Sequence, residues 1–85
     1  MIIFTTKRCL ACKNLKKELN KKNVLFNEID INENEDLFNL VSLKENTDQT
    51  PLVGIKKNGE LVFLKKGKDY DNLNELVNII FDNIF

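Results

Sequence analysis

The chain has 85 residues, which is enough for a single domain spanning 1–85 and too few for two. Its 13 basic and 13 acidic side chains balance to a formal net charge of zero, so no basic field exists to attract nucleic acid or an anionic membrane surface. No apolar run approaches the roughly 20 residues of a membrane span, and the opening MIIFTT is too short for a signal peptide. We therefore expect a cytoplasmic protein that binds neither nucleic acid nor membrane.

The first half of the chain alternates between strand and helix patterns. Residues 2–5 (IIFT) form a short apolar run that predicts a buried strand. From Leu10, apolar residues recur every four positions between lysines, which predicts an amphipathic helix that ends at residues 20–23. Residues 24–31 (VLFNEIDI) predict a second strand, with Leu25 and the two isoleucines on one face.

A second helix is predicted to begin in NENED, residues 32–36. Its asparagines are good N-caps, and its acidic residues suit the positive end of the helix dipole. An apolar face that contains Leu37, Leu40 and Val41 carries the helix to about Asn46, after which TDQTP breaks it.

The second half of the chain predicts a hairpin followed by a helix. Strands are expected at 52–55 and 61–64, because Asn58-Gly59 between them suits a two-residue turn. A clean helical stripe follows at 73–84. The order β-α-β-α-β-β-α predicts an α/β protein with one mixed four-stranded sheet covered by three helices. Its first two strands are expected to be parallel and its last two antiparallel.

The two cysteines of the chain, Cys9 and Cys12, stand where the first strand gives way to the first helix. In the reducing cytosol, such a close pair is more often catalytic or metal-binding than a structural staple. Unsatisfied backbone N–H groups at a helix start stabilise a thiolate, and Lys7, Arg8 and Lys13 add positive charge. We therefore predict a pKa for Cys9 below the usual value of about 8.5.

Cys12 lies deeper in the helix and is expected to keep a higher pKa than Cys9. This difference between the two thiols predicts a two-step exchange. The Cys9 thiolate attacks a substrate disulfide and forms a mixed disulfide. Cys12, one turn into the helix, then attacks that bond, releases the reduced substrate and leaves the Cys9–Cys12 pair oxidised.

Other uses of the two thiols stay open from the sequence. A structural zinc ion wants four ligands, and the chain has two cysteines and no histidine, so we expect no metal site within one copy. Two copies could share zinc or a cluster through four thiolates. The pair could also act as a redox sensor or binding module, or be two incidental core cysteines.

The only proline, Pro51, stands at the mouth of the predicted third strand after Gln49-Thr50. A proline that starts a strand is common and needs no function. The alternative is a cis peptide bond between Thr50 and Pro51, which is rare for X-Pro bonds in general.

Taken together, these motifs resemble the thioredoxin superfamily, and within it the short glutaredoxin-like proteins, including the hydrogen donors of ribonucleotide reductase. The resemblance implies a thioredoxin-like α/β fold. The resemblance rests on FTTKRCLAC (residues 4–12), on Thr50-Pro51, on the Asn58-Gly59 turn and on the KGKD loop at 66–69. It implies that Cys9 is the nucleophile, that Cys12 resolves the intermediate, and that Pro51 is cis and packs beside the sulfurs. Thr50 is implied to offer its backbone to an incoming peptide or to glutathione.

The resemblance also implies partners and a wider groove. It implies no tightly bound cofactor, with glutathione as a candidate co-substrate. A disulfide-containing protein, ribonucleotide reductase among the candidates, is implied as substrate of a monomer that glutathione or thioredoxin reductase re-reduces. Leu10-Ala11 replaces the Pro-Tyr of glutaredoxins and the Gly-Pro of thioredoxins. The residues implied to bind glutathione or substrate are Lys7, Arg8, Gln49, Gly67, Lys68, Asp69 and Tyr70.

Overall fold

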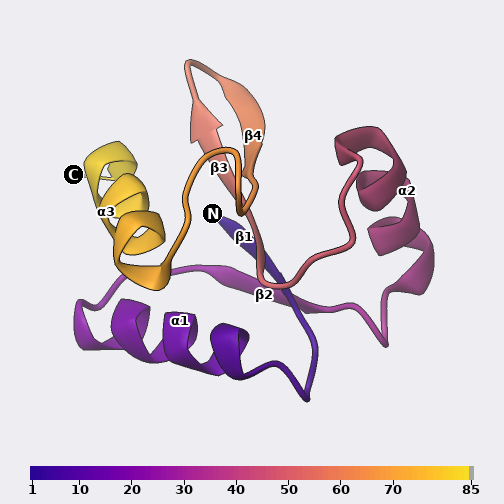
Figure 1. Ribbon diagram of the computed structural model, residues 1–85, viewed down its shortest axis with the longest axis horizontal. Coiled ribbons are helices and arrows are strands. Elements are labelled where there is room, and N and C mark those ends of the chain that lie inside the picture. Colours follow the sequence, from indigo (N-terminus) through magenta and orange to yellow (C-terminus); the bar gives the residue numbers. More distant parts are fainter. Residues whose placement is uncertain (85) are drawn as a thin grey trace.

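Four strands and three helices follow one another in the predicted order in the computed structural model, which describes residues 1–84. This arrangement is a mixed α/β sheet of the thioredoxin-like type, and it confirms the predicted fold class (Figure 1). The elements are β1 (Ile2–Thr5), α1 (Leu10–Lys21), β2 (Asn27–Asp30), α2 (Glu35–Glu45), β3 (Leu52–Lys57), β4 (Glu60–Leu64) and α3 (Leu73–Ile84).

The sheet has the strand order β2-β1-β3-β4. β1 runs parallel to β2 and antiparallel to β3, and its residue Phe4 pairs with Leu52 at the start of β3. The chain leaving β1 and the chain entering β3 therefore meet at the same end of the sheet. This pairing places the cysteine segment next to the segment that contains Pro51.

The two faces of the sheet carry different helices. Side chains alternate along β1, so that Ile3 packs in one apolar cluster and Phe4 in the other. α1 and α3 cover the face of Ile3, and α2 covers the face of Phe4 (Figure 1). The cluster under α1 and α3 is the larger, with ten buried residues: Ile3, Leu15, Leu19, Val24, Val53, Ile55, Leu64, Tyr70, Leu76 and Ile80.

A polar network ties α1 to the two strands beside it. The buried hydroxyl of Thr5 donates a hydrogen bond to a carboxylate oxygen of Glu28 at 2.7 Å, and the Lys16 ammonium pairs with the same oxygen at 2.8 Å. The hydrogen bond from Lys16, followed by that from Thr5, lowers the pKa of Glu28 below its usual value. Lys16 thus helps to hold α1 against the end of β1 from which the cysteine segment leaves.

The predicted second strand is shorter than expected. The strand covers only Asn27–Asp30, because its parallel partner β1 offers four residues for pairing. Asn23 takes a positive φ of 56° as the chain leaves α1, and Val24 turns into the core. Leu25 is 91% exposed, so the prediction that it shares a buried face with the isoleucines is wrong.

The predicted apolar face of the second helix is also partly wrong. α2 buries Phe38 and packs Val41 against it, whereas Leu37 and Leu40 are exposed and do not face the sheet. Helical periodicity alone permits either face, because the apolar residues of this helix are spread around it and do not form one stripe. Contact with Phe4, whose ring centroid lies 5.5 Å from that of Phe38, selects the face that is buried.

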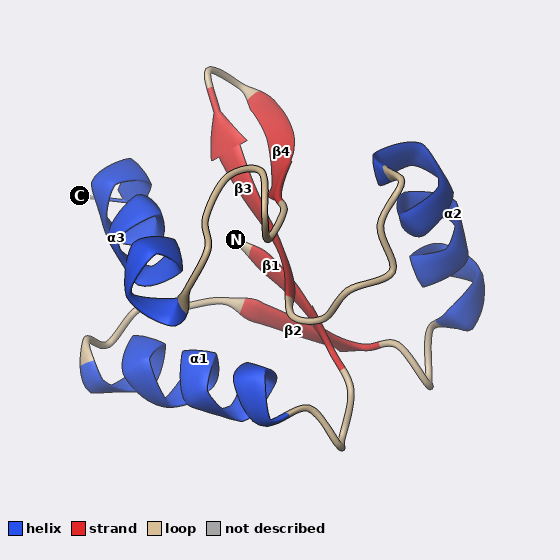
Figure 2. Cartoon of the chain, in the orientation of Figure 1, coloured by secondary structure: helices blue, strands red, loops and turns tan. Residues whose placement is uncertain are grey.

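The hairpin of β3 and β4 is confirmed, with Asn58 and Gly59 at positive φ values of 55° and 83° in its turn. β3 pairs with β1 only through Leu52–Gly54, so the rest of the hairpin extends beyond β1 (Figure 2). The extension leaves the start of β3, and not its far end, beside the cysteine segment.

The burial of each leucine predicts how strongly its replacement lowers the free energy of unfolding. Leu15→Ala in α1 should lower the free energy of unfolding by about 2–5 kcal/mol, because Leu15 is fully buried and its loss leaves a cavity. Leu43→Ala in α2 is the matched control, since Leu43 is 82% exposed, and it should change stability by less than about 0.5 kcal/mol. Urea denaturation measures both values, and equal losses would contradict the packing described here.

Candidate active site

Cys9 occupies the N-cap of α1. Its backbone is extended, with φ −106° and ψ 103°, and its carbonyl accepts the first helical hydrogen bond, from Lys13 N–H. Its Sγ accepts a hydrogen bond from the Cys12 N–H at 3.1 Å. An N-cap side chain that accepts from this position satisfies one of the free donors of the helix start.

The two sulfurs form a disulfide, with the Cα atoms 5.2 Å apart. The cysteines differ in their exposure. Cys12 is 1% exposed and belongs to the buried face of α1, whereas Cys9 is partly exposed at the helix start. An incoming molecule can therefore reach Cys9 and not Cys12.

Thr50 lies against the Cys9 sulfur, although the two residues are far apart in the sequence. The Thr50 hydroxyl donates to Cys9 Sγ at 3.6 Å, and the Thr50 carbonyl oxygen lies 3.6 Å from the same sulfur. The Thr50–Pro51 peptide bond is cis, and Pro51 is buried. The pairing of β1 with β3 produces this contact.

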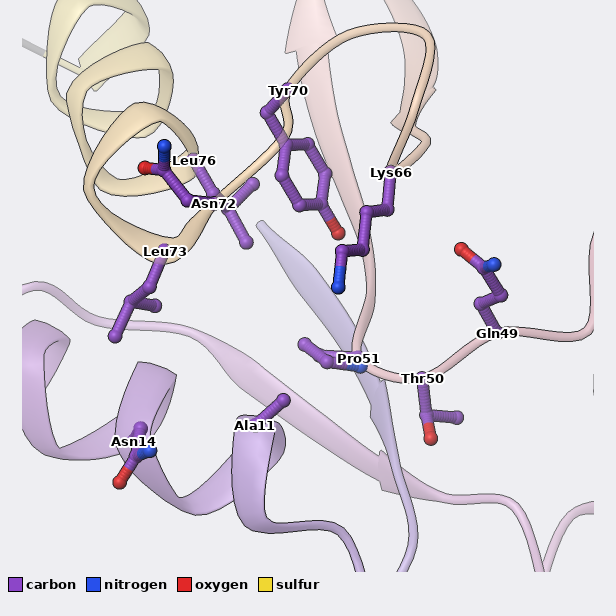
Figure 3. A pocket seen from close by; sticks show the side chains of 10 residues that line it. All are labelled: Ala11, Asn14, Gln49, Thr50, Pro51, Lys66, Tyr70, Asn72, Leu73 and Leu76. Carbon is purple, nitrogen blue, oxygen red and sulfur yellow. The ribbon is translucent and has the colours of Figure 1, made fainter.

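A pocket of about 330 Å³ opens next to this contact. It lies between the start of α1, the segment before β3 and the segment that leads into α3 (Figure 3). One wall is apolar, and amide, hydroxyl and ammonium groups form the rest. Its lining residues are Ala11, Asn14, Gln49, Thr50, Pro51, Lys66, Tyr70, Asn72, Leu73 and Leu76.

The structure brings four of the sequence-predicted groove residues to this pocket, namely Gln49, Thr50, Pro51 and Tyr70. Lys7 and Arg8 are exposed in the turn between β1 and α1, and they do not line it.

Hydrogen bonds within residues 65–70 fix the conformation of the KGKD loop. Gly67 takes a positive φ of 88° and donates its N–H to the Tyr70 carbonyl at 2.7 Å. The Asp69 carboxylate accepts a hydrogen bond from Lys65 N–H at 2.8 Å, and Lys68 is exposed. Gly67, Lys68 and Asp69 therefore shape or border the loop and do not line the pocket.

Sequence reasoning missed Lys66, Asn14 and Asn72, which also line the pocket. Asn14 could have been found, because it follows Ala11 by one helical turn and so lies on the same side of α1. Lys66 carried no such signal, since its direction depends on how the loop at 66–70 closes.

Tyr70 is a buried side chain in this pocket. Burial, and to a smaller degree the negative charge of Asp69, raises the pKa of its phenol above the usual value. The hydroxyl therefore stays protonated at neutral pH and can donate a hydrogen bond.

Among residues 1–84, no group of three or more histidine, cysteine, aspartate or glutamate side chains is arranged to hold a metal ion. The helices described in this range include none with the length and apolar character needed to cross a membrane.

The sequence pattern of the glutaredoxin family matches residues 1–61, a stretch that contains both cysteines and the Thr50–Pro51 bond. The chain belongs to the glutaredoxin family. Family membership and the Cys9–Cys12 disulfide together support a thiol–disulfide redox function. Glutaredoxins act on disulfide substrates and use glutathione as a reductant rather than as a bound cofactor.

A solved structure described as "Structure of a malarial protein" resembles this glutaredoxin with a TM-score of 0.59 and 22% sequence identity. The match covers 99% of this chain and 94% of the malarial one, and at that identity it shows the shared fold alone. No curated protein matches the sequence significantly.

The difference in exposure between the two cysteines predicts different reactivity in this glutaredoxin. After reduction, Cys9 should react with iodoacetamide at least about tenfold faster than Cys12 at pH 7, because Cys12 is buried and Cys9 faces solvent. Peptide mapping by mass spectrometry at short times measures both rates. Equal rates would contradict the placement of Cys12 in the core.

Proposed function

We propose that this glutaredoxin-family chain is a dithiol–disulfide oxidoreductase that carries electrons to disulfides in proteins or small molecules. The observation that supports this most directly is the Cys9–Cys12 disulfide at the start of α1, with one sulfur accessible and the other buried. A pair built in this way can react with a substrate at one sulfur and resolve the product at the other.

The reaction transfers two electrons. In the reduced protein the Cys9 thiolate attacks one sulfur of the substrate disulfide, forms a mixed disulfide and expels the first substrate thiolate, which takes up a proton. Cys12 then loses its proton and attacks Cys9 Sγ, which expels the second substrate thiolate. The substrate disulfide becomes two thiols, and the two protein thiols become the Cys9–Cys12 disulfide. The Cys12 N–H, which lies 3.1 Å from Cys9 Sγ, can stabilise the thiolate at the start of this sequence.

We propose that Thr50 and Pro51 form the surface that the substrate contacts next to Cys9. The Thr50 hydroxyl and carbonyl both lie 3.6 Å from Cys9 Sγ, so a substrate sulfur that bonds to Cys9 sits beside this backbone. An extended peptide or glutathione could then pair with the Thr50 backbone as an added strand. Gln49 and Tyr70 border the same pocket, which supports a role for them in substrate binding.

The proposed carrier needs a source of electrons. Glutathione and thioredoxin reductase are the two candidates, and a protein disulfide such as that of ribonucleotide reductase is a candidate substrate. The single-domain organisation over 1–85, the monomeric state and the cytoplasmic location stay predictions from the sequence.

Two serine variants test the two-thiol mechanism. Cys9→Ser should reduce turnover of a peptide disulfide to the uncatalysed rate, because it removes the attacking thiolate. With no glutathione present, Cys12→Ser should accumulate a mixed disulfide through Cys9, because the resolving thiol is missing. Intact-mass spectrometry detects this species as the mass of the protein plus one half of the substrate.

The variant with both cysteines replaced serves as the blank in both measurements. If Cys12→Ser turns over the peptide disulfide like the unmodified protein and forms no adduct, the two-thiol mechanism is wrong. A redox sensor would form and break its own disulfide but would show no catalytic turnover.

A further inference from the structure

An ion pair joins the end of α2 to the end of β4. The Lys65 ammonium lies 3.4 Å from a carboxylate oxygen of Glu45, the last residue of α2. The two side chains are only 24% and 19% exposed, so both charges are partly withdrawn from water. Solvent and salt therefore screen this ion pair less than they screen a pair on the open surface.

Two walls of the pocket beside Cys9 begin at this ion pair. Residues 46–51 continue from Glu45 and supply the side chains of one wall (Figure 3). Residues 65–70 begin with Lys65 and supply those of another (Figure 3). The ion pair therefore links the points from which the two walls start.

Residues 46–49 have few other attachments. Across residues 1–84, the hydrogen bonds of this segment run only within it and back to Ser42 in α2. The position of the segment therefore depends on Glu45 at its start and on Thr50 at its end, which contacts the accessible sulfur.

The opposite wall is attached to the backbone of Lys65. The Lys65 N–H donates to the Asp69 carboxylate at 2.8 Å, and the Lys65 carbonyl accepts from the Asp69 N–H at 2.8 Å. A displacement of Lys65 would therefore carry the loop at 65–70 with it, including the side chains that line the pocket.

We propose that Glu45 and Lys65 are positioning residues that hold these two walls at the separation which a bound substrate requires. Neither side chain is among those that line the pocket, so each acts through the segment that it holds. This inference rests on the proposed redox function and adds to it two residues outside the site. A disulfide that extends from Cys9 along the pocket should depend on the ion pair, whereas a disulfide too small to touch both walls should not.

The test compares two disulfides as oxidants of the pre-reduced protein. Bis(2-hydroxyethyl) disulfide is the small one, and a short uncharged peptide whose cysteine is disulfide-linked to 2-mercaptoethanol is the extended one. Each second-order rate constant is divided by the rate constant of the same disulfide with free dithiothreitol, which corrects for its intrinsic reactivity. The ratio of the two corrected constants measures the preference for the extended substrate, and no external reductase is needed.

The unmodified protein should prefer the peptide disulfide by about tenfold, because contacts away from the reacting sulfur add binding energy. Glu45→Gln and Lys65→Met each remove one charge of the pair. Each should reduce the preference by about threefold, near the upper end of the range for exposed ion pairs, and leave the rate with the small disulfide unchanged within about twofold. Lys21→Met is the matched control, because it breaks the more exposed Lys21–Glu18 pair at 3.5 Å in α1, and it should keep the full preference.

A charge swap separates the ion pair from other effects of these substitutions. Glu45→Lys alone and Lys65→Glu alone place like charges together and should lower the preference at least as much as the neutral variants. The double variant forms an ion pair of reversed polarity and should recover the preference to within about twofold of the unmodified protein. Urea denaturation of each variant measures its stability separately.

Three results would overturn the positioning role and leave the redox function standing. They are a preference that survives in Glu45→Gln and Lys65→Met, a loss that the charge swap does not recover, and an equal loss of rate with both disulfides. An unmodified protein without a preference for the peptide would overturn it as well. If neither disulfide oxidises the reduced protein, the proposed redox function fails, and the inference fails with it.

Discussion

The antiparallel pairing of β1 with β3 brings together two segments that lie 41 residues apart, so that Cys9 Sγ and the Thr50 carbonyl are separated by 3.6 Å. Neither segment forms a site alone. The first supplies an accessible sulfur at a helix start, and the second supplies the backbone that is proposed to hold the substrate. If this pairing shifted by one residue, Phe4 and Ile3 would exchange faces, and the core and the site would be lost together.

The core also determines how the two sulfurs differ. α1 is held on the sheet by Leu15 and Leu19, which are fully buried, and by the ion pair of Lys16 with Glu28 at its side. Cys12 lies on this same buried face, while Cys9 stands one turn earlier, where the helix begins. The position of the helix therefore leaves one sulfur accessible and the other shielded, which is the difference that the proposed two-step exchange requires.

Local patterns in the sequence predict the parts of this protein that depend on local physics. The spacing of Cys9 and Cys12, the Asn58-Gly59 turn and the stripe of α3 each need only a few neighbouring residues, and the structure has them as expected. The buried face of α2 could not be predicted in this way, because leucines surround Phe38 and only the position of Phe4 decides which side packs.

The residues that line the pocket show the same limit of prediction from local sequence patterns. Tyr70 could be suspected from its place in the loop before α3, but Lys66 could not, because a lysine in a polar loop normally extends into solvent. Only the closure of the loop, with Gly67 at positive φ, brings the two side chains to one end of the pocket. Long-range contacts of this kind follow from the tertiary fold and leave no periodic signal in the sequence.

The most direct test of the central claim is a reductase-coupled assay that follows NADPH consumption with a model disulfide. One reaction supplies glutathione and glutathione reductase, and a second supplies thioredoxin reductase, each with Cys9→Ser as the blank. If the protein is an electron carrier, the rate of NADPH consumption should rise in proportion to the protein concentration in at least one reaction. The reaction that responds identifies the reductant. No consumption above the blank in either reaction, although the Cys9–Cys12 pair can still be oxidised and reduced, would contradict the account.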